Sequence, residues 1–231
     1  VYVVETGFFD HLIEKNTIQR KVISPWHDIA LYINSAYRQN GVVSMVVEIP
    51  KNTREKIEIN KTIRLNPLTY DIRNGNIRRI MYKNGYPAHY GALPQTWEDP
   101  NHIDERTGLV GDNDPMDAFD LSMLPTQSGE VIHLKVLGCI AMIDQGETDW
   151  KVVGINVKDP KSQLLNDIDD VSRDDIADLI DFLRNYKVSE GKGQNTFHYR
   201  LLWDRASTLA IIADQHDNWT KLIENNTENH N

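Results

Sequence analysis

The chain has 231 residues, a hydrophobic composition of 40% and a formal net charge of -9 at pH 7. This length and composition can bury one large core, and the acidic balance argues against a main partner that is a nucleic-acid backbone. No stretch approaches the roughly 20 apolar residues of a membrane span, and no signal-peptide pattern opens the sequence. We therefore expect one soluble domain over residues 1–231, with neither nucleic acid nor membrane as partner.

Short β-rich stretches separated by turn signals dominate residues 40–160. The predicted strands cover residues 42–49, 55–59, 77–82, 131–143 and 152–157. Several short strands at this spacing predict a small barrel or sandwich. We expect an N-terminal extension over about 1–40, the barrel over about 41–160 and a helical C-terminal part over about 165–224.

Two helices are predicted after the barrel. Ser172 and Asp175 form an N-terminal cap, and apolar residues then repeat on one face over 176–183. A second apolar stripe predicts a helix over 209–223. The fold class is therefore α+β, mainly β, in which a barrel carries flanking helices. The single cysteine, Cys139, lies in an apolar run and is expected to be a buried structural thiol.

The densest charge lies in the run GDNDPMD at 111–117, which contains Asp112, Asp114 and Asp117. Two carboxylates about 5 Å apart repel by about 3 kcal/mol at an effective dielectric of about 20. Such a cluster suggests a hard cation such as Mg²⁺ or Mn²⁺. The same residue types also make acidic surface turns, and the run alone favours neither interpretation. An EF-hand is excluded because Asp117 stands where a calcium loop needs Gly, and Met123 where it needs Glu.

Two further charged groups lie near predicted strands. The stretch DQGETDWK at 144–151 begins where a buried strand ends, which would place its carboxylates at the rim of the barrel. A solvated hairpin loop explains that stretch equally well when it is taken alone. Lys56 and Glu58 are two residues apart and would share one side of a strand, with Glu48 upstream. An ordinary solvent-facing strand surface is the favoured interpretation of this third group alone.

Cationic and phenolic side chains complete the inventory, and each has an ordinary explanation when taken singly. They are Arg78, Tyr90, Tyr186, Lys187 and Lys192. Carboxylates for several divalent ions, together with Lys, Arg and Tyr donors for phosphoryl oxygens, are the groups that metal-assisted phosphoryl transfer to water requires. The sequence contains no Walker loop, no nucleophile elbow and no Cys/His metal spacing that would favour another chemistry.

Motifs in a fixed order resemble the soluble inorganic pyrophosphatases of family I. They are EIPKNTREKIEI at 48–59, YGALPQTWEDP at 90–100, GDNDPMD at 111–117, DQGETDWK at 144–151 and LNDIDDV at 165–171. The similarity runs over about 24–223, and SPWHDI and the length resemble the eukaryotic type. The resemblance implies an OB-like five-stranded β-barrel with flanking helices, and Mg²⁺-dependent hydrolysis of pyrophosphate to two orthophosphates without a covalent intermediate.

The resemblance also implies roles for individual residues. Asp112, Asp117 and Asp149 match ligands of tightly bound metals, with Asp117 bridging two of them, and Asp144 and Glu58 match positions that serve metals arriving with substrate. Asp114 matches the carboxylate that accepts a proton from the metal-bridging water. The positions that match phosphate-holding groups are Lys56, Arg78, Tyr90, Tyr186 and Lys187. The positions that match supporting groups in the pocket are Glu48, Lys151 and Lys192, of which Lys192 is also expected to contact substrate.

Several further expectations follow from the resemblance. They are several Mg²⁺ ions with Mn²⁺ as a substitute, a homodimer, and a cytoplasmic location, or a mitochondrial one if a targeting segment is missing from this chain. Trp26, Trp97 and Tyr37 are candidate interface aromatics, although a core role is favoured for each.

The chain departs from the family pattern in two places. The stretch NGYPAHYGAL around Tyr90 is shorter than the usual eukaryotic form, and HYRLLWDR at 198–205 has no clear match. Both departures affect loops and partner surfaces rather than the matched residues. One alternative to an enzyme is a catalytically silent scaffold subunit that keeps the fold. The other is an OB-type nucleic-acid binder, which needs a basic and aromatic strand face, whereas the candidate face here is acidic.

Overall fold

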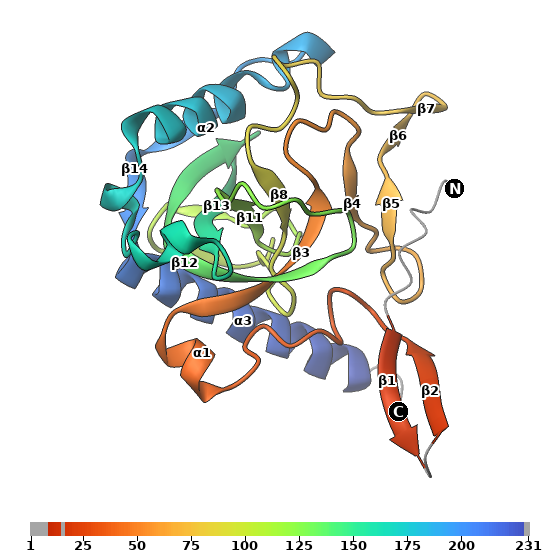
Figure 1. Ribbon diagram of the computed structural model, residues 1–231. Coiled ribbons are helices and arrows are strands. Elements are labelled where there is room, and N and C mark those ends of the chain that lie inside the picture. Colours follow the sequence, from red (N-terminus) through yellow and green to blue (C-terminus); the bar gives the residue numbers. More distant parts are fainter. Residues whose placement is uncertain (1–8, 15–16, 229–231) are drawn as a thin grey trace.

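Five strands close into a ring at the centre of the computed structural model, which describes residues 9–14 and 17–228 (Figure 1). In order around the ring they are β13 (Glu147–Asn156), β11 (Asp117–Asp120), β8 (His89–Ala92), β3 (Val42–Ile49) and β12 (Val131–Asp144). The long strand β12 pairs with both β3 and β13, which closes the ring. β11 runs parallel to β13, and the other neighbours in the ring are antiparallel. The expected OB-like five-stranded barrel is confirmed.

Most of the strands predicted for the barrel are present. β3, β12 and β13 confirm the predictions over 42–49, 131–143 and 152–157, although β13 already begins at Glu147. The strand predicted over 55–59 is shorter, because only β4 (Ile57–Ile59) pairs with β5 (Leu68–Tyr70). The remaining short elements are β1 (Phe9–Glu14), β2 (Thr17–Val22), α1 (Ser35–Gln39), β6 (Ile72–Arg73), β7 (Asn76–Ile77), β9 (Ile103–Asp104), β10 (Leu109–Val110), η1 (Pro160–Gln163), η2 (Ile168–Asp170) and η3 (Val188–Glu190).

The prediction of a strand over 77–82 is wrong for most of that range. Only its first residue belongs to a strand, at the end of β7 (Asn76–Ile77). The chain beyond it makes irregular backbone hydrogen bonds instead of a ladder: Lys56 N donates to Arg78 O at 2.9 Å, and Ile80 N donates to Arg54 O at 2.7 Å. The apolar and cationic residues of this stretch therefore lie in an irregular segment that the residue pattern does not distinguish from a strand.

The C-terminal part is not purely helical, which corrects the expectation for residues 165–224. β14 (Thr196–Asp204) pairs with β12 outside the ring. Its register jumps from the pair of Ile140 with Leu202 to the pair of Met142 with Phe197, so residues 198–201 bulge out of the ladder. Tyr199 in this bulge is 93% exposed. The bulge interrupts the alternation of buried and exposed residues that would have revealed a strand.

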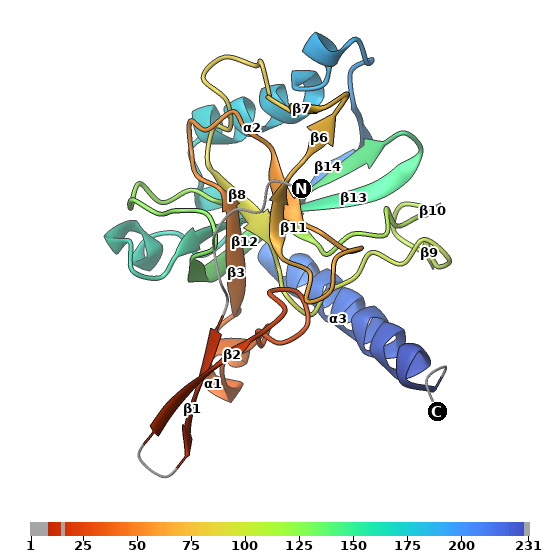
Figure 2. The same ribbon diagram turned by 90° about the vertical axis from the view of Figure 1, so that its right-hand side faces the viewer.

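Two helices lie on opposite sides of the barrel (Figures 1 and 2). α2 (Arg173–Asn185) begins as predicted, with the Ser172 hydroxyl accepting a hydrogen bond from Asp175 N at 3.1 Å. α3 (Arg205–Glu228) starts earlier and ends later than the predicted range of 209–223. Among the described residues, no helix combines the length and the apolar character that crossing a bilayer needs.

The apolar run in β12 is continuous because both faces of the strand are buried. Ile140 and Met142 belong to one hydrophobic cluster with Phe182 of α2. Cys139 belongs to a second cluster with Ile211 of α3. A strand that is covered on both faces loses the usual apolar and polar alternation. Burial raises the pKa of the Cys139 thiol to about 12, which confirms the structural role expected for this residue.

We expect the substitution Gly91→Ala in β8 to lower the free energy of unfolding by about 1 to 3 kcal/mol, the usual range for overpacking. An added Cβ would lie 1.9 Å from the carbonyl oxygen of Val46 on β3, so the two strands would have to separate. Denaturant unfolding measures this change. Gly193→Ala is the control, because its added Cβ meets nothing within 4 Å. Equal stability of the two variants would contradict this account of the barrel.

Candidate active site

A polar cavity of about 220 Å³ is lined by barrel strands and by the C-terminal end of α2. Every predicted site residue except Glu48 and Glu58 lines it: Lys56, Arg78, Tyr90, Asp112, Asp114, Asp117, Asp144, Asp149, Lys151, Tyr186, Lys187 and Lys192. A smaller cavity of about 50 Å³ is lined by Glu48 and Glu58, and it shares Lys56, Tyr90, Asp114 and Asp117 with the first. The structure therefore brings together residues that lie up to 144 positions apart in the sequence, from Glu48 to Lys192.

The strands of the ring determine which side chains meet. Asp149 and Lys151 are two residues apart on β13 and therefore face the same side of that strand. Asp117 begins β11 and pairs in parallel register with Lys151. Asp144 ends β12, where a two-residue turn leads into β13. Closure of the barrel thus places carboxylates from three strands beside one another.

The acidic run at 111–117 is an ordered turn, and its carboxylates line the cavity. Trp97 Nε1 donates to the side-chain oxygen of Asn113 at 2.9 Å, and Glu98 N donates to Asp114 O at 2.9 Å. Asn113 has a left-handed φ of 68°, and Asp112 Oδ1 accepts a hydrogen bond from Asp114 N at 3.0 Å. The turn interpretation and the metal-site interpretation are therefore compatible, because the turn presents the carboxylates.

A buried lysine holds the carboxylate cluster together. The side chain of Lys151 is 4% exposed, and its ammonium group forms ion pairs with both Asp117 and Asp149. Burial alone would lower the pKa of Lys151, but the charges of Asp117 and Asp149 outweigh burial and raise it. Burial raises the pKa of Asp149 to about 6. Burial, followed by repulsion from Asp149, also raises the pKa of Asp112 well above its usual value.

The donor set fits hard divalent cations. Glu98, Asp112 and Asp149 each offer a carboxylate oxygen, and these oxygens lie within 4.8 Å of one another. Glu98 Oε1 accepts a hydrogen bond from Trp150 N at 2.9 Å. Glu98 Oε2 and Asp144 Oδ1 are buried and have no hydrogen-bond partner in the described part of the chain. Clustered carboxylate oxygens with unused acceptor capacity are the ligands that Mg²⁺ and Mn²⁺ prefer.

The group around β4 also belongs to the site. Lys56 and Glu58 form an ion pair on one side of the strand, and Ile57 and Ile59 are buried on the other. This confirms the predicted shared side. The interpretation as an ordinary solvent-facing surface is wrong, because Lys56 lines both cavities and its side chain is only 20% exposed. Glu48 Oε1 accepts a hydrogen bond from Ile59 N at 2.8 Å, which ties β3 to β4 beneath the smaller cavity.

Cationic and phenolic groups line the same cavity as the carboxylates. Lys187 forms an ion pair with Asp144, and burial lowers the pKa of Lys187. Tyr90 is buried and Tyr186 is half-buried, and desolvation raises both phenol pKa values, so the hydroxyls stay protonated and able to donate near neutral pH. Arg78 also lines the cavity. The cavity therefore combines oxygen ligands for cations with hydrogen-bond donors for an anion.

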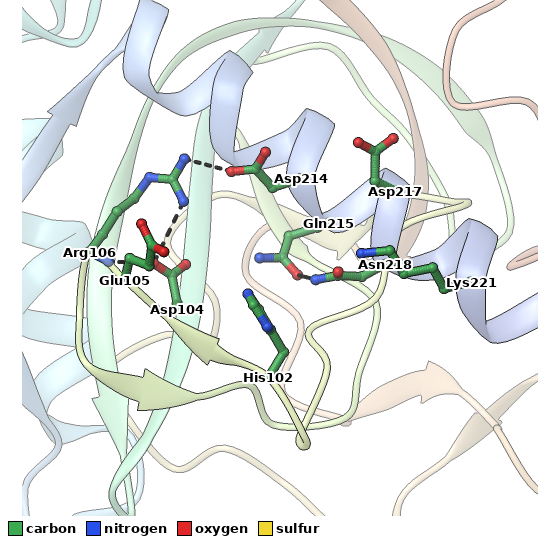
Figure 3. Close-up of a pocket in the computed structure, with 9 residues that line it drawn as sticks. All are labelled: His102, Asp104, Glu105, Arg106, Asp214, Gln215, Asp217, Asn218 and Lys221. Carbon is green, nitrogen blue, oxygen red and sulfur yellow. Dashed lines mark hydrogen bonds and ion pairs between the residues drawn. The ribbon is translucent and has the colours of Figure 1, made fainter.

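A second polar cavity, of about 430 Å³, lies between α3 and residues 102–106, which include β9 (Figure 3). It is larger than the cavity described above but contains none of the predicted residues. Arg106 in its wall forms ion pairs with Asp104 and Asp214, at 3.6 and 2.6 Å. Asp104 also accepts a hydrogen bond from Trp150 Nε1 at 3.1 Å. This cavity therefore lies behind β13, the strand that carries Asp149 and Lys151.

Comparisons with known proteins agree with this geometry. The sequence model of the family described as inorganic pyrophosphatase matches residues 45–220. The inorganic pyrophosphatase of Bos taurus is 43% identical over 214 residues, which cover 89% of this chain and 72% of that protein. The chain belongs to the inorganic pyrophosphatase family. The protein of Kluyveromyces lactis with the same name is 42% identical over 213 residues, covering 88% of this chain and 72% of that protein.

Solved structures of inorganic pyrophosphatases share the fold. That of Schistosoma japonicum has a TM-score of 0.83 and 40% identity, and the match covers 93% of this chain and 76% of that one. An N-terminally truncated vacuolar soluble pyrophosphatase of Trypanosoma cruzi, solved in complex with PPi, has a TM-score of 0.85 and 33% identity. That match covers 96% of this chain and 93% of the other. The family assignment thus rests on sequence and fold together.

Several residues in or beside this cavity lie outside the predicted set. Tyr86 and Arg73 line the cavity, and Glu98 completes the cluster of carboxylate oxygens. The rings of Tyr86 and Tyr90 are tilted against each other with centroids 5.1 Å apart, and a tyrosine four positions before Tyr90 is the only sequence signal for Tyr86. Glu98 lies within the quoted motif YGALPQTWEDP, where its burial behind β13 could not be recognised.

Addition of millimolar Mg²⁺ should raise the melting temperature more at about pH 8 than at about pH 5. The pKa of Asp149 rises from 3.8 to about 6 on folding, so the folded state binds the extra proton between these values. The stability from that proton is complete below about pH 4 and is lost as the pH rises through about 6. At high pH the carboxylate is ionised, and a bound cation then supplies stability in place of the proton.

Thermal scans with and without Mg²⁺ at the two pH values measure the difference. NaCl at matched ionic strength controls for general screening. A Mg²⁺ effect that is equal at both pH values, or absent, would contradict a cation site built from these carboxylates.

Proposed function

We propose that this enzyme hydrolyses inorganic pyrophosphate to two orthophosphates, with Mg²⁺ as its cation. One observation carries the proposal: carboxylates able to hold several cations and Lys, Arg and Tyr donors able to hold phosphoryl oxygens line a single cavity. Relatives with 42–43% identity that bear the name inorganic pyrophosphatase, and the Trypanosoma cruzi structure with PPi, support the same substrate.

Carboxylates on the barrel would hold the cations. Asp112, Asp117 and Asp149 are the proposed main ligands, with Asp144 and Glu58 at the edges of the cluster. When bound, divalent cations neutralise the charge of pyrophosphate and lower the pKa of the attacking water. Lys151, between Asp117 and Asp149, keeps part of the cluster neutral before cations arrive.

The proposed proton acceptor is Asp114. Its side chain is 49% exposed at the cavity and forms an ion pair with Lys61, so it can exchange a proton with solvent after each turnover. The described lining of the two cavities contains no Ser, Thr, Cys or His side chain. Direct attack by water, with Asp114 as general base, therefore fits the residues available.

Lysine, arginine and tyrosine side chains would bind the two phosphates. Tyr90 lines the cavity from barrel strand β8, Lys56 lines it from just before β4 and Arg78 from just after β7. Tyr186 and Lys187 line it from the end of α2, with Lys192 beyond them. Negative charge grows on the leaving phosphate during hydrolysis, and donors already fixed in place stabilise it without reorganising. Glu48 would act indirectly, by tying β3 to β4 through Ile59 N.

The remaining expectations rest on the resemblance alone and are part of the same proposal. They are a homodimer, Mn²⁺ as a substitute for Mg²⁺, and a cytoplasmic location. Trp26 and Trp97 are buried in the core, whereas Tyr37 is half-buried against His133 with ring centroids 5.4 Å apart. Only Tyr37 therefore keeps part of its ring available to a partner. A catalytically silent scaffold is not favoured, because the complete set of predicted residues lines the two cavities.

Phosphate release from pyrophosphate, with and without Mg²⁺, tests the proposed function, and Asp117→Asn tests its residue assignment. The variant should lower kcat at least about 100-fold, because it removes a charge shared by the cation cluster. ATP in place of pyrophosphate tests whether the cavity accepts a nucleotide. Asp178→Asn, on the exposed face of α2, is the matched control and should keep parental activity. Near-parental turnover by Asp117→Asn would contradict the assignment.

A further inference from the structure

Each guanidinium nitrogen of Arg78 has a carboxylate partner. Its Nε donates to Glu190 Oε1 at 2.7 Å, and its Nη2 donates to Glu190 Oε2 at 2.9 Å. Its Nη1 donates to Asp71 Oδ2 at 3.2 Å. The Arg78 side chain is 6% exposed, so water solvates its positive charge only weakly. The paired Nε and Nη2 groups form the two-pronged edge that also recognises phosphate.

Glu190 reaches Arg78 from a distant part of the chain. It ends η3 (Val188–Glu190), 112 positions after Arg78, and lies between Lys187 and Lys192, which both line the cavity. The segment is anchored at both ends, since Tyr186 N donates to Phe182 O at 2.9 Å and Asn195 N donates to Arg184 O at 3.1 Å. Gly191, with φ of 78°, closes the short turn directly after Glu190.

The surrounding charges are balanced without a ligand. Arg73 lies 3.4 Å from both Asp71 and Glu190, so two arginines face two carboxylates. A phosphate that binds Arg78 through Nε and Nη2 must displace the Glu190 carboxylate from the same two groups. When Glu190 is displaced from Arg78, Arg73 remains beside it as a second cationic partner.

We propose that Glu190 is a built-in competitor for Arg78, which sets the affinity of the cavity for phosphate groups. This inference rests on the proposed function, because it takes Arg78 to be a phosphate ligand. In the absence of substrate, Glu190 neutralises the buried guanidinium. When a phosphate binds, it takes the place of the carboxylate, and when product leaves, the carboxylate takes its place back. Glu190 therefore weakens ground-state binding and favours release of orthophosphate.

Isothermal titration with methylenediphosphonate, a hydrolysis-resistant analogue of pyrophosphate, tests the competition in the presence of Mg²⁺. Glu190→Gln keeps the shape of the side chain but removes its charge, and we expect it to bind the analogue about tenfold more tightly. KM for pyrophosphate should fall, and inhibition by orthophosphate should strengthen. Glu190→Asp keeps the charge and should stay closer to the parent than Glu190→Gln does.

Glu55→Gln is the matched control, because Glu55 pairs with Arg79 outside the cavity at 3.1 Å. It should bind the analogue as the parent does. Glu190→Ala provides a second charge-free variant, and circular dichroism verifies that each variant is folded. Unchanged or weaker binding by Glu190→Gln and Glu190→Ala would overturn the inference, since a residue that merely positions Arg78 would lower affinity when removed. A different result would separate the two proposals. If the Glu190 variants bind the analogue more tightly but the parent protein releases no phosphate from pyrophosphate, the proposed function is refuted and the competition stands.

Discussion

Carboxylates crowded into a buried site need positive charge beside them, and this constraint shapes the whole cavity. Asp117 and Asp149 lie on neighbouring parallel strands because the barrel closes, and Lys151 stands between them. The lysine provides one positive charge for two carboxylates, while Asp112 and Glu98 remain close by. Each unpaired buried charge would cost several kcal/mol. With Lys151 as the only cation beside them, some of these carboxylates must stay protonated. Bound divalent cations would allow all of them to ionise.

The residues proposed to bind phosphate are also paired with opposite charges. Lys187 is paired with Asp144, Lys56 with Glu58, and Arg78 with Glu190 and Asp71. Lys187, Lys56 and Arg78 thus each have a carboxylate partner in the protein. Binding of cations to the carboxylates and of phosphates to the lysines and arginine would exchange these internal ion pairs for pairs with ligands. The cavity is in this sense assembled before its ligands arrive.

Much of the site was predictable because its residues lie in compact motifs. Asp112, Asp114 and Asp117 share one turn, and Asp149 and Lys151 alternate on one strand, so local rules place them correctly. Strand spacing predicted a barrel or a sandwich, and the family resemblance implied the five-stranded barrel. Pairing over long distances was not predictable: nothing local connects Arg78 with Glu190. Glu98 was missed for a similar reason, because its burial depends on β13 packing over it.

The errors in the fold have related causes. β14 has no regular alternation, because a bulge breaks its register beside β12. Residues 77–82 have the composition of a strand, but the hydrogen bonds of Lys56 and Ile80 with this region are irregular. α3 extends beyond its apolar stripe because helical hydrogen bonding continues through polar residues at both ends. Local patterns thus identified the elements whose burial is periodic and failed where partners elsewhere in the chain decide the conformation.

The central claim is the proposal that carboxylates lining the cavity, Asp117 among them, would hold more than one divalent cation. Electron paramagnetic resonance of the protein titrated with Mn²⁺ tests it most directly, because two Mn²⁺ ions about 4 Å apart are magnetically coupled. The account predicts at least two Mn²⁺ ions per chain and a coupled signal that Asp117→Asn abolishes. A single isolated Mn²⁺ signal, unchanged by that substitution, would contradict it.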